Sequence, residues 1–324
     1  MHPKAHGCVD ATFQINEDIP ADLRVGLFST PGKKYQARIR YSNATALVDN
    51  DVDISAESKK VTNKSRGMAV KVLDIEPGGD FLQEDCGARN QDFLMINTPS
   101  FAFANVSDYL LLNQILVEDN DDIRRFFAPL ASGDFTKEQQ AVAAQTFKIV
   151  QQISAIPVAD PLESSYFGAA PFGFGDKQVM RFTAKPRVAA NPQVLPNNPS
   201  PNYLKEALDE RMKQAQPVVF DFMLQVRKKS EDNLVIENAT QHWDEAKYPF
   251  VKVAVITIAA PQTNISTAEN QTACENLVFN PWHALSAHEP LGGINRLRKA
   301  VYNKSAETRL EDTPSTCPFS DNNT

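Results

Sequence analysis

The sequence predicts an α+β fold, in which an antiparallel barrel or sheet has helices attached. Several short runs are apolar or alternate between apolar and polar residues, as strands do. Most of these runs follow one another without a helix between them, which argues against a parallel βαβ sheet. Three longer segments have helical periodicity. The expected strands are 11–16, 36–42, 67–75, 92–97, 179–183, 218–226 and 250–259, and the expected helices are 106–118, 137–153 and 202–214.

The composition is that of a soluble globular protein, with 42% apolar and 23% charged residues in a chain of 324. The net charge of −7 argues against nucleic acid as a partner. No apolar run approaches the roughly 18–20 residues that a transmembrane helix needs. We therefore expect one domain, 1–324, with a flexible polar tail at 314–324 and no transmembrane segment.

The four cysteines are far apart, at positions 8, 86, 274 and 317. Their spacing lacks the C-x-x-C pattern of many metal and redox sites. The sequence therefore predicts neither a zinc site nor a disulfide framework.

A short motif near the C-terminus combines a tyrosine with two arginines. Arg298 and Tyr302 are four residues apart, so on a helix they share a face, and Arg309 follows two turns later. A phenol ligates a metal poorly while it is protonated, and a neighbouring cation favours the phenolate. The spacing alone also fits an amphipathic helix whose tyrosine packs on the core.

Four further segments precede this motif in a fixed order. They are His2-Pro-Lys4-Ala, Arg40-Tyr-Ser42, the hexapeptide RGMAVK at 66–71, and INTPSF at 96–101. Together with Arg298, Tyr302 and Arg309, they resemble the catalase superfamily, whose members carry H-x-K-G, R-F-S, R-G-F-A-V-K, N-N-T-P-V-F-F and R-x-x-x-Y in this order. The resemblance spans nearly the whole chain. It implies an antiparallel β-barrel core that encloses haem b, with flanking α-helices.

The resemblance assigns a role to each motif residue. Tyr302 would be the axial ligand of the haem iron, supported by Arg298, since tyrosine ligation is known catalase chemistry. His2 would be the distal acid and base, Asn97 would position the peroxide, and Ser42 would orient the imidazole.

The remaining site residues would hold the haem itself. Arg40 and Arg309 resemble propionate partners, and Tyr109 is near the position of an aromatic ring that packs on the porphyrin. Arg66 resembles a residue that ties a loop. His6 is an alternative to His2, because H-x-K-G can be aligned at either position. The histidines at 242, 283 and 288 match no family motif.

The sequence also departs from the family. The family carries a propionate-binding arginine three residues before the distal histidine, but only Met1 precedes His2 here. We therefore expect an N-terminally truncated sequence. A cytoplasmic location is the default expectation, and a periplasmic or secreted location is the alternative if a signal segment has been lost.

The resemblance implies a haem oxidoreductase that decomposes hydrogen peroxide or organic hydroperoxides, as a homodimer or homotetramer. Two alternatives stay open. One is an isomerase of fatty acid hydroperoxides, of the allene oxide or epoxy alcohol synthase type. The other is a non-catalytic haem-binding barrel.

Overall fold

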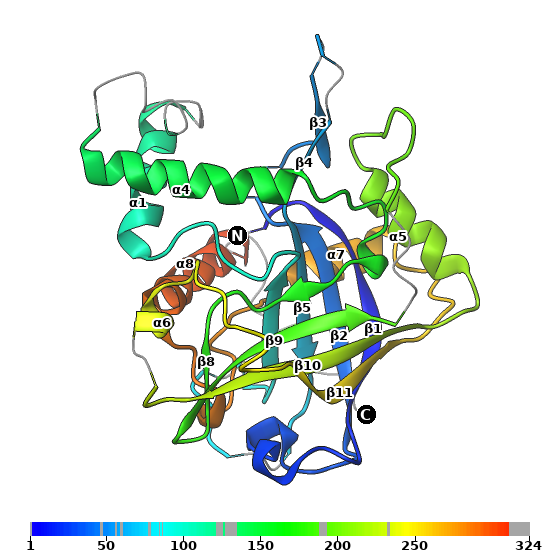
Figure 1. Ribbon diagram of the computed structural model, residues 1–324. Coiled ribbons are helices and arrows are strands. Elements are labelled where there is room, and N and C mark those ends of the chain that lie inside the picture. Colours follow the sequence, from blue (N-terminus) through cyan, green and yellow to red (C-terminus); the bar gives the residue numbers. More distant parts are fainter. Residues whose placement is uncertain are drawn as a thin grey trace.

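An antiparallel barrel of eight strands forms the centre of the protein in the computed structural model (Figure 1). The structure describes residues 2–45, 48–55, 57–58, 61–76, 79–83, 85, 87–120, 126, 135–187, 193–231 and 234–310. The strands pair in the order β10-β11-β1-β2-β5-β6-β7-β9, and β9 closes the barrel by pairing with β10. Their bounds are β1 Ala5–Ile15, β2 Lys34–Asn43, β5 Arg66–Val72, β6 Gln91–Ile96, β7 Tyr166–Phe167, β9 Gln178–Pro186, β10 Val218–Lys228 and β11 Val251–Ile258.

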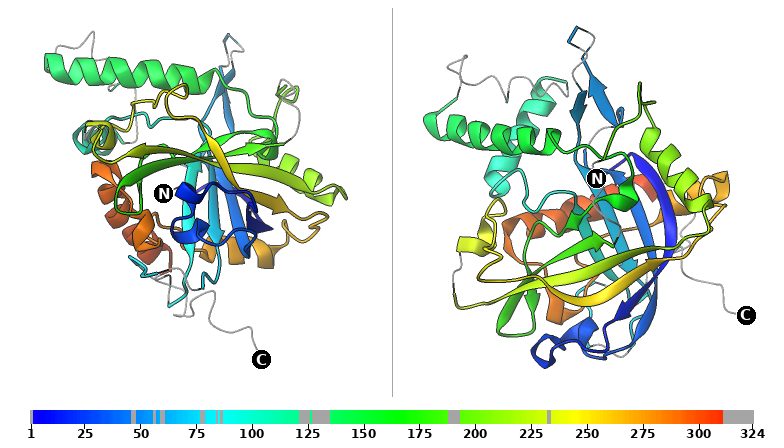
Figure 2. Two further views of the ribbon diagram at one scale, coloured as in Figure 1. Left: turned by 60° about the horizontal axis from the view of Figure 1, so that its bottom comes forward. Right: turned by 45° about the vertical axis from the view of Figure 1, so that its right-hand side comes forward.

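Three shorter strands lie outside this barrel. The strand β8 (Phe172–Phe174) pairs with the first three residues of β9, 178–180. The strands β3 (Val52–Ile54) and β4 (Val61–Asn63) pair with each other, and they project beyond one end of the barrel in Figures 1 and 2.

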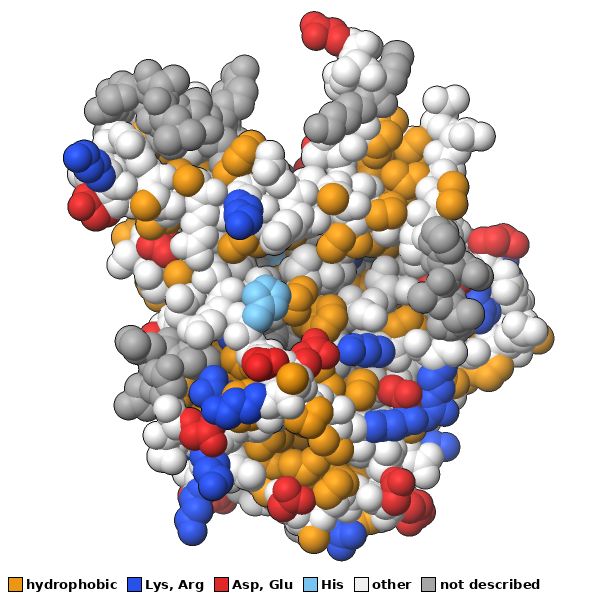
Figure 3. Space-filling view, viewed as in Figure 1, with side chains coloured by type: hydrophobic (Ala, Val, Ile, Leu, Met, Phe, Trp, Pro, Cys, Tyr) orange, Lys and Arg blue, Asp and Glu red, His pale blue; other side chains and the backbone are white. Residues whose placement is uncertain are grey.

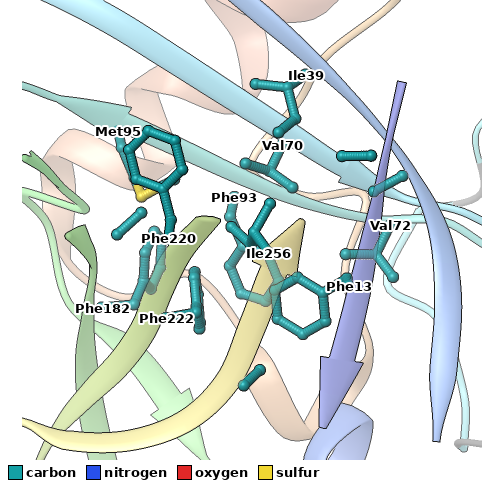
Figure 4. Close-up of a cluster of buried hydrophobic side chains, with 14 of the residues drawn as sticks. Phe13, Ile39, Val70, Val72, Phe93, Met95, Phe182, Phe220, Phe222 and Ile256 are labelled. Atoms are coloured by element: carbon teal, nitrogen blue, oxygen red, sulfur yellow. The ribbon is translucent and has the colours of Figure 1, made fainter. Parts of the chain in front are cut away.

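Aromatic side chains fill the barrel interior (Figure 4). The ring of Phe93 has its centroid 4.8 Å from that of Phe222 and 5.0 Å from that of Phe182. Because side chains alternate along a strand, Ile39 and Tyr41 of β2 point into this core while Arg40, between them, points out. The antiparallel barrel of the prediction is confirmed, but its packed interior leaves the outer face as the place for a ligand.

Helices cover this outer face and one end of the barrel. The helix α7 (Ala268–Asn276) contacts β1, and α8 (Gly292–Leu310) follows it along the chain. The helices α1 (Val106–Glu118) and α4 (Lys137–Ser154) contact each other, and α4 crosses above the end of the barrel in each view of Figures 1 and 2. The other elements are α5 Tyr203–Lys213 and α6 Leu234–Glu237, with 3-10 turns at Ala21–Leu23, Gly26–Phe28, Pro161–Glu163 and Ser286–His288.

The three predicted helices agree with α1, α4 and α5 to within one residue at each end. The start of α4 has a local cause, because Thr136 and Gln139 form a reciprocal capping box. The expected flexible tail, 314–324, lies outside the described residues. Among the described residues, no helix has the length and hydrophobicity required to cross a bilayer.

A disulfide joins Cys8 of β1 to Cys274 of α7, with their Cα atoms 5.6 Å apart. This corrects the prediction from cysteine spacing. The two residues are 266 positions apart in the sequence, and only the packing of α7 on the outer face of the barrel brings them together. Cys86 and Cys317 lie outside the described residues.

A buried ion cluster attaches the chain before α8 to the outer face of the sheet. The ammonium of Lys71 lies 2.5 Å from Asp85 Oδ2 and 2.8 Å from Asp92 Oδ1. His283 Nδ1 lies 2.9 Å from the other oxygen of Asp92. Since a buried carboxylate needs partners, this cluster fixes the segment that leads into α8. Lys71 and His283 together lower the pKa of Asp92 against the opposing effect of its burial.

Candidate functional site

A cavity of about 820 Å³ lies against the outer face of β2, β5 and β6, and it is bounded on the other side by α8 and α1. Its volume falls within the range of roughly 300–1,000 Å³ that is typical of ligand sites. Apolar side chains form much of its wall, and seven of its polar residues are ones that the sequence had singled out. The predicted site residues that line it are His2, Arg40, Ser42, Tyr109, Arg298, Tyr302 and Arg309.

The helix α8 carries Arg298, Tyr302 and Arg309 on one continuous element, which is the condition under which their spacing places them on one side. The guanidinium carbon of Arg298 lies 5.5 Å from the centre of the Tyr302 ring, at a distance typical of a cation–π contact. Arg298 is 8% exposed and donates a hydrogen bond of 3.0 Å to Asn295 Oδ1. Tyr302 therefore faces the cavity with a cation held beside its ring.

On the barrel side of the cavity, His2 lies next to Ser42 of β2. The distance from Ser42 Oγ to His2 Nδ1 is 3.4 Å. Gly67 makes this approach feasible, since a Cβ atom on Gly67 would lie 2.7 Å from Ser42 Oγ and 2.8 Å from His2 Nδ1. Burial first, and then the charge of Arg40, lower the pKa of His2 from 6.5 to about 3. The imidazole is therefore neutral at physiological pH and can accept a proton.

The structure does not place Asn97 on the cavity wall. Its Oδ1 atom accepts hydrogen bonds from the Arg66 backbone N–H (2.8 Å) and from Ser65 Oγ (3.2 Å). Its Nδ2 atom is buried without a hydrogen-bond partner among the described residues. The preceding residues, Leu94, Met95 and Ile96 of β6, line the cavity instead. The role of Asn97 in positioning peroxide therefore stays a prediction, and the structure does not bring it to the site.

Two further cations lie at the edge of the cavity near α7. Arg40 Nη2 is 3.5 Å from Glu275 Oε2, and Arg309 donates to the backbone carbonyls of Glu275 and Leu277. Burial is the main cause that lowers the pKa of Arg40, and Glu275 opposes this effect. The two arginines predicted as propionate partners are thus neighbours, and α7 supplies their acceptors.

Tyr109 of α1 lies on the cavity wall, and its packing against a porphyrin stays a prediction. Its ring packs edge-on against Phe103 at 5.1 Å, and its backbone oxygen accepts from Asn113 Nδ2 at 2.7 Å. Burial raises the pKa of Tyr109, so the phenol is neutral. It provides an aromatic surface at the cavity.

None of the other four histidines lines the cavity. His6, the alternative distal residue, is buried, and its Nδ1 atom is 3.9 Å from Asp51 Oδ1. His283 belongs to the ion cluster, and His288 Nε2 accepts from the Leu27 backbone N–H at 3.1 Å. His242 is exposed. Of the two candidates, only His2 faces the cavity.

Arg66 ties a loop, as the sequence predicted. Its guanidinium donates to Asn43 Oδ1 and to the Asp51 backbone oxygen. Among the described residues, no group of three or more His, Cys, Asp or Glu side chains could hold a metal ion.

The shape of this chain resembles that of known catalase structures. A fungal catalase aligns over 98% of this chain and 60% of its own, with a TM-score of 0.69 and 17% identity. Catalase A from Saccharomyces cerevisiae aligns over 100% of this chain and 65% of its own, with a TM-score of 0.69 and 16% identity. A bacterial catalase aligns over 100% of this chain and 60% of its own, with a TM-score of 0.68 and 16% identity.

The chain has the catalase fold. It spans 60–65% of the length of these three structures. No protein-family profile matches the sequence, and no curated protein matches it. The catalase fold of this chain is therefore a divergent one.

Sequence reasoning missed three residues that shape the site in this catalase fold. Gly67 lies in the RGMAVK motif, but nothing in the motif shows that its missing side chain makes room for His2. Glu275 lies in a segment with little amphipathic pattern, so α7 itself was not predicted. Ile96 could have been found from strand alternation, since it precedes Asn97 at the end of β6.

Proposed function

We propose that this protein binds haem b and cleaves hydrogen peroxide or organic hydroperoxides. The observation that carries the proposal is the placement of Tyr302, with Arg298 beside it, and of His2 on the walls of one cavity in a catalase fold. A phenol on one side and a neutral imidazole on the other are the donor and the base that this chemistry requires.

The residues of the cavity fit a haem. Tyr302 offers the single oxygen donor expected from the proximal side, and Arg40 and Arg309 lie close enough together to receive two propionates. The apolar wall and the ring of Tyr109 suit the faces of a porphyrin. Because Gly67 has no side chain, the imidazole of His2 can lie close against the barrel side of the cavity wall.

When bound, the haem iron would supply the redox centre at which the O–O bond breaks. The protein's own contribution is proton movement. His2 would take a proton from one oxygen of the hydroperoxide and return it to the other oxygen, which would leave as water or an alcohol. The two electrons for this cleavage would come from the bound haem, and a second peroxide or an added electron donor would have to restore them. The pKa of about 3 keeps His2 unprotonated and ready for the first transfer. Ser42 fixes the ring through its contact with Nδ1.

Haem binding is tested by reconstituting the protein with hemin and recording its Soret band. We expect Tyr302→Phe to lose tight haem binding, because a phenyl ring offers no ligand. Tyr35→Phe is the matched control, since Tyr35 belongs to the barrel core and not to the cavity wall. Haem retention in Tyr302→Phe equal to that of the control would overturn the proposal.

Catalysis is tested with His2→Ala in the haem-loaded protein. Loss of the base should lower peroxide turnover by about 10²–10⁴-fold while the Soret band is kept. Asn97→Ala tests the predicted role of Asn97 separately from that of His2. Its side chain supports the Arg66 backbone, so we expect reduced stability and a smaller loss of turnover than in His2→Ala. Full activity in His2→Ala would show that another group moves the proton.

A further inference from the structure

The cavity extends well beyond the space between Tyr302 and His2. It continues between the helices α1 and α4, where Leu112, Leu116, Val150 and Ile153 line it together with Asn113, Thr146 and Ser154. The side chains of Asn113 and Thr146 donate to backbone carbonyls, so the free surface of this part is largely apolar. Hydrogen peroxide has no apolar surface that this part of the wall could cover. Each methylene group of a larger substrate that is buried there would strengthen binding about fourfold.

The cations that line the cavity already have partners within the described part of the chain. Arg40 pairs with Glu275, and Arg309 donates to two backbone carbonyls of the α7 region. Arg298 is bonded to Asn295 and lies beside the Tyr302 ring. With the haem propionates on Arg40 and Arg309, as proposed above, a substrate carboxylate would find none of these three cations free.

The fourth cation, Lys64, lies where the cavity meets the projecting pair of strands β3 and β4. Its Nζ atom is 2.6 Å from Asp49 Oδ2 and 2.9 Å from Asp53 Oδ1. Lys64 is 10% exposed, whereas Asp53 is 63% exposed, so the acidic side of this group faces the solvent. We call these three residues the mouth triad.

The mouth triad carries one positive and two negative charges. The ammonium of Lys4 also donates to the Asp49 backbone oxygen, but its charge is paired with Asp51, so the triad keeps a net negative charge. A negatively charged group at contact distance from one uncompensated carboxylate is disfavoured about fivefold, even in a water-like dielectric. On the face shown in Figure 3, hydrophobic side chains are exposed along α4, below the projecting strands and in the middle of the lower half, where charged side chains of both signs surround them.

We propose that the cavity takes neutral organic hydroperoxides with an apolar body, and that the mouth triad selects against substrates with a free carboxylate. This inference rests on the proposed peroxide cleavage, because it names the substrate class of the same site. Lys64, Asp49 and Asp53 act as specificity-determining residues, and they take no part in the proton transfer at His2.

The test compares one fatty acid hydroperoxide with its methyl ester, below the concentrations at which either forms micelles. These two substrates differ in the carboxylate charge and in one methyl group, which by itself can favour the ester about fourfold. The dependence on salt and on Asp53 therefore isolates the effect of the charge. We expect kcat/KM of the haem-loaded protein to be at least about fivefold higher for the ester at low salt. The ratio should fall toward one as ionic strength rises, because salt screens exposed charges.

Binding is measured separately with the corresponding hydroxy ester and hydroxy acid, which cannot be cleaved. The shift in melting temperature of the purified protein should be larger for the ester. Asp53→Asn removes the net negative charge of the triad, so the preference for the ester over the acid should become smaller. Asp18→Asn is the matched control, since Asp18 is exposed and does not line the cavity, and it should keep the full preference.

The outcomes separate this inference from the proposed function. Equal or tighter binding of the acid, or a preference that Asp53→Asn leaves unchanged, would overturn the inference. Cleavage of both substrates with the acid favoured would overturn it while supporting peroxide cleavage. Preferential binding of the ester by a haem-loaded protein that cleaves neither compound would support the cavity's selectivity and refute the proposed reaction.

Discussion

Removal of the disulfide between Cys8 and Cys274 should destabilise the protein and loosen one edge of the cavity. The bond attaches α7 to the outer face of β1. Glu275, the next residue, pairs with Arg40, and its backbone carbonyl accepts from Arg309. The covalent link and the acceptors for both arginines therefore belong to one short segment.

The size of the effect follows from the length of chain that the bond closes. With 266 residues of separation, the chain-entropy relation gives about 5–6 kcal/mol at 25 °C. Measured losses for native disulfides are typically about 2–5 kcal/mol, because unfolded chains retain some structure. We therefore expect Cys8→Ala/Cys274→Ala to lose about 2–5 kcal/mol. This is a large share of the roughly 5–15 kcal/mol by which domains are stable.

The assay is urea unfolding of the wild type and the double variant, each with and without a reductant. The wild type should lose stability on reduction to about the level of the variant. The variant should not respond, which controls for any effect of the reductant on Cys86 and Cys317. Alkylation of the unreduced wild type, read by mass spectrometry, should leave Cys8 and Cys274 unmodified. Alkylation of both under native conditions, or a stability difference below about 0.5 kcal/mol, would refute the reasoning.

Three further predictions concern single groups. Gly67→Ala places a methyl group against His2, so peroxide turnover should fall by about 10²-fold with a much smaller change in melting temperature; unchanged turnover would contradict the placement of the imidazole. Lys71→Met leaves two buried carboxylates without their cation and should cost about 3–5 kcal/mol in urea unfolding, and a cost below 1 kcal/mol would show that the cluster is dispensable. His6 and His288 have pKa values of about 4, lowered mainly by burial, so the unfolded chain binds protons more readily below pH 6.5 and stability falls as the pH drops from 6.5 toward 4. Together the two histidines should lower the free energy of unfolding by up to about 4 kcal/mol at pH 5. Equal urea midpoints at pH 7 and pH 5 would argue against buried neutral imidazoles.

Local patterns in the sequence were sufficient for most secondary structure and for the proximal side of the site. The segment 106–118 was predicted as a helix from its own periodicity, and α1 has the same bounds. Arg298, Tyr302 and Arg309 were placed on one helix from their spacing, which a helix converts directly into position. The strand 11–16 was recognised only in part, because a bulge between Ala5 and Gly7 and the outward-facing Cys8 interrupt its alternation.

The distal side shows where a motif is insufficient. The segment INTPSF contains both Ile96 and Asn97, and only the direction of the strand's last residues decides which one meets the cavity. That direction depends on the register of β6 against β5 and β7. Register is set by pairing with distant strands, so it cannot be read from the segment itself.

The sequence by itself determined seven of the eight barrel strands, the helices α1, α4 and α5, the order of the catalase-like motifs and seven residues of the cavity wall. These depend on neighbours a few positions apart or on short motifs. The tertiary structure alone decided that the cavity lies outside the packed barrel, that Cys8 meets Cys274, and that Glu275 meets Arg40. The physical reason is that closing the barrel and packing α7 against it join residues more than 200 positions apart. No local propensity or spacing encodes such contacts.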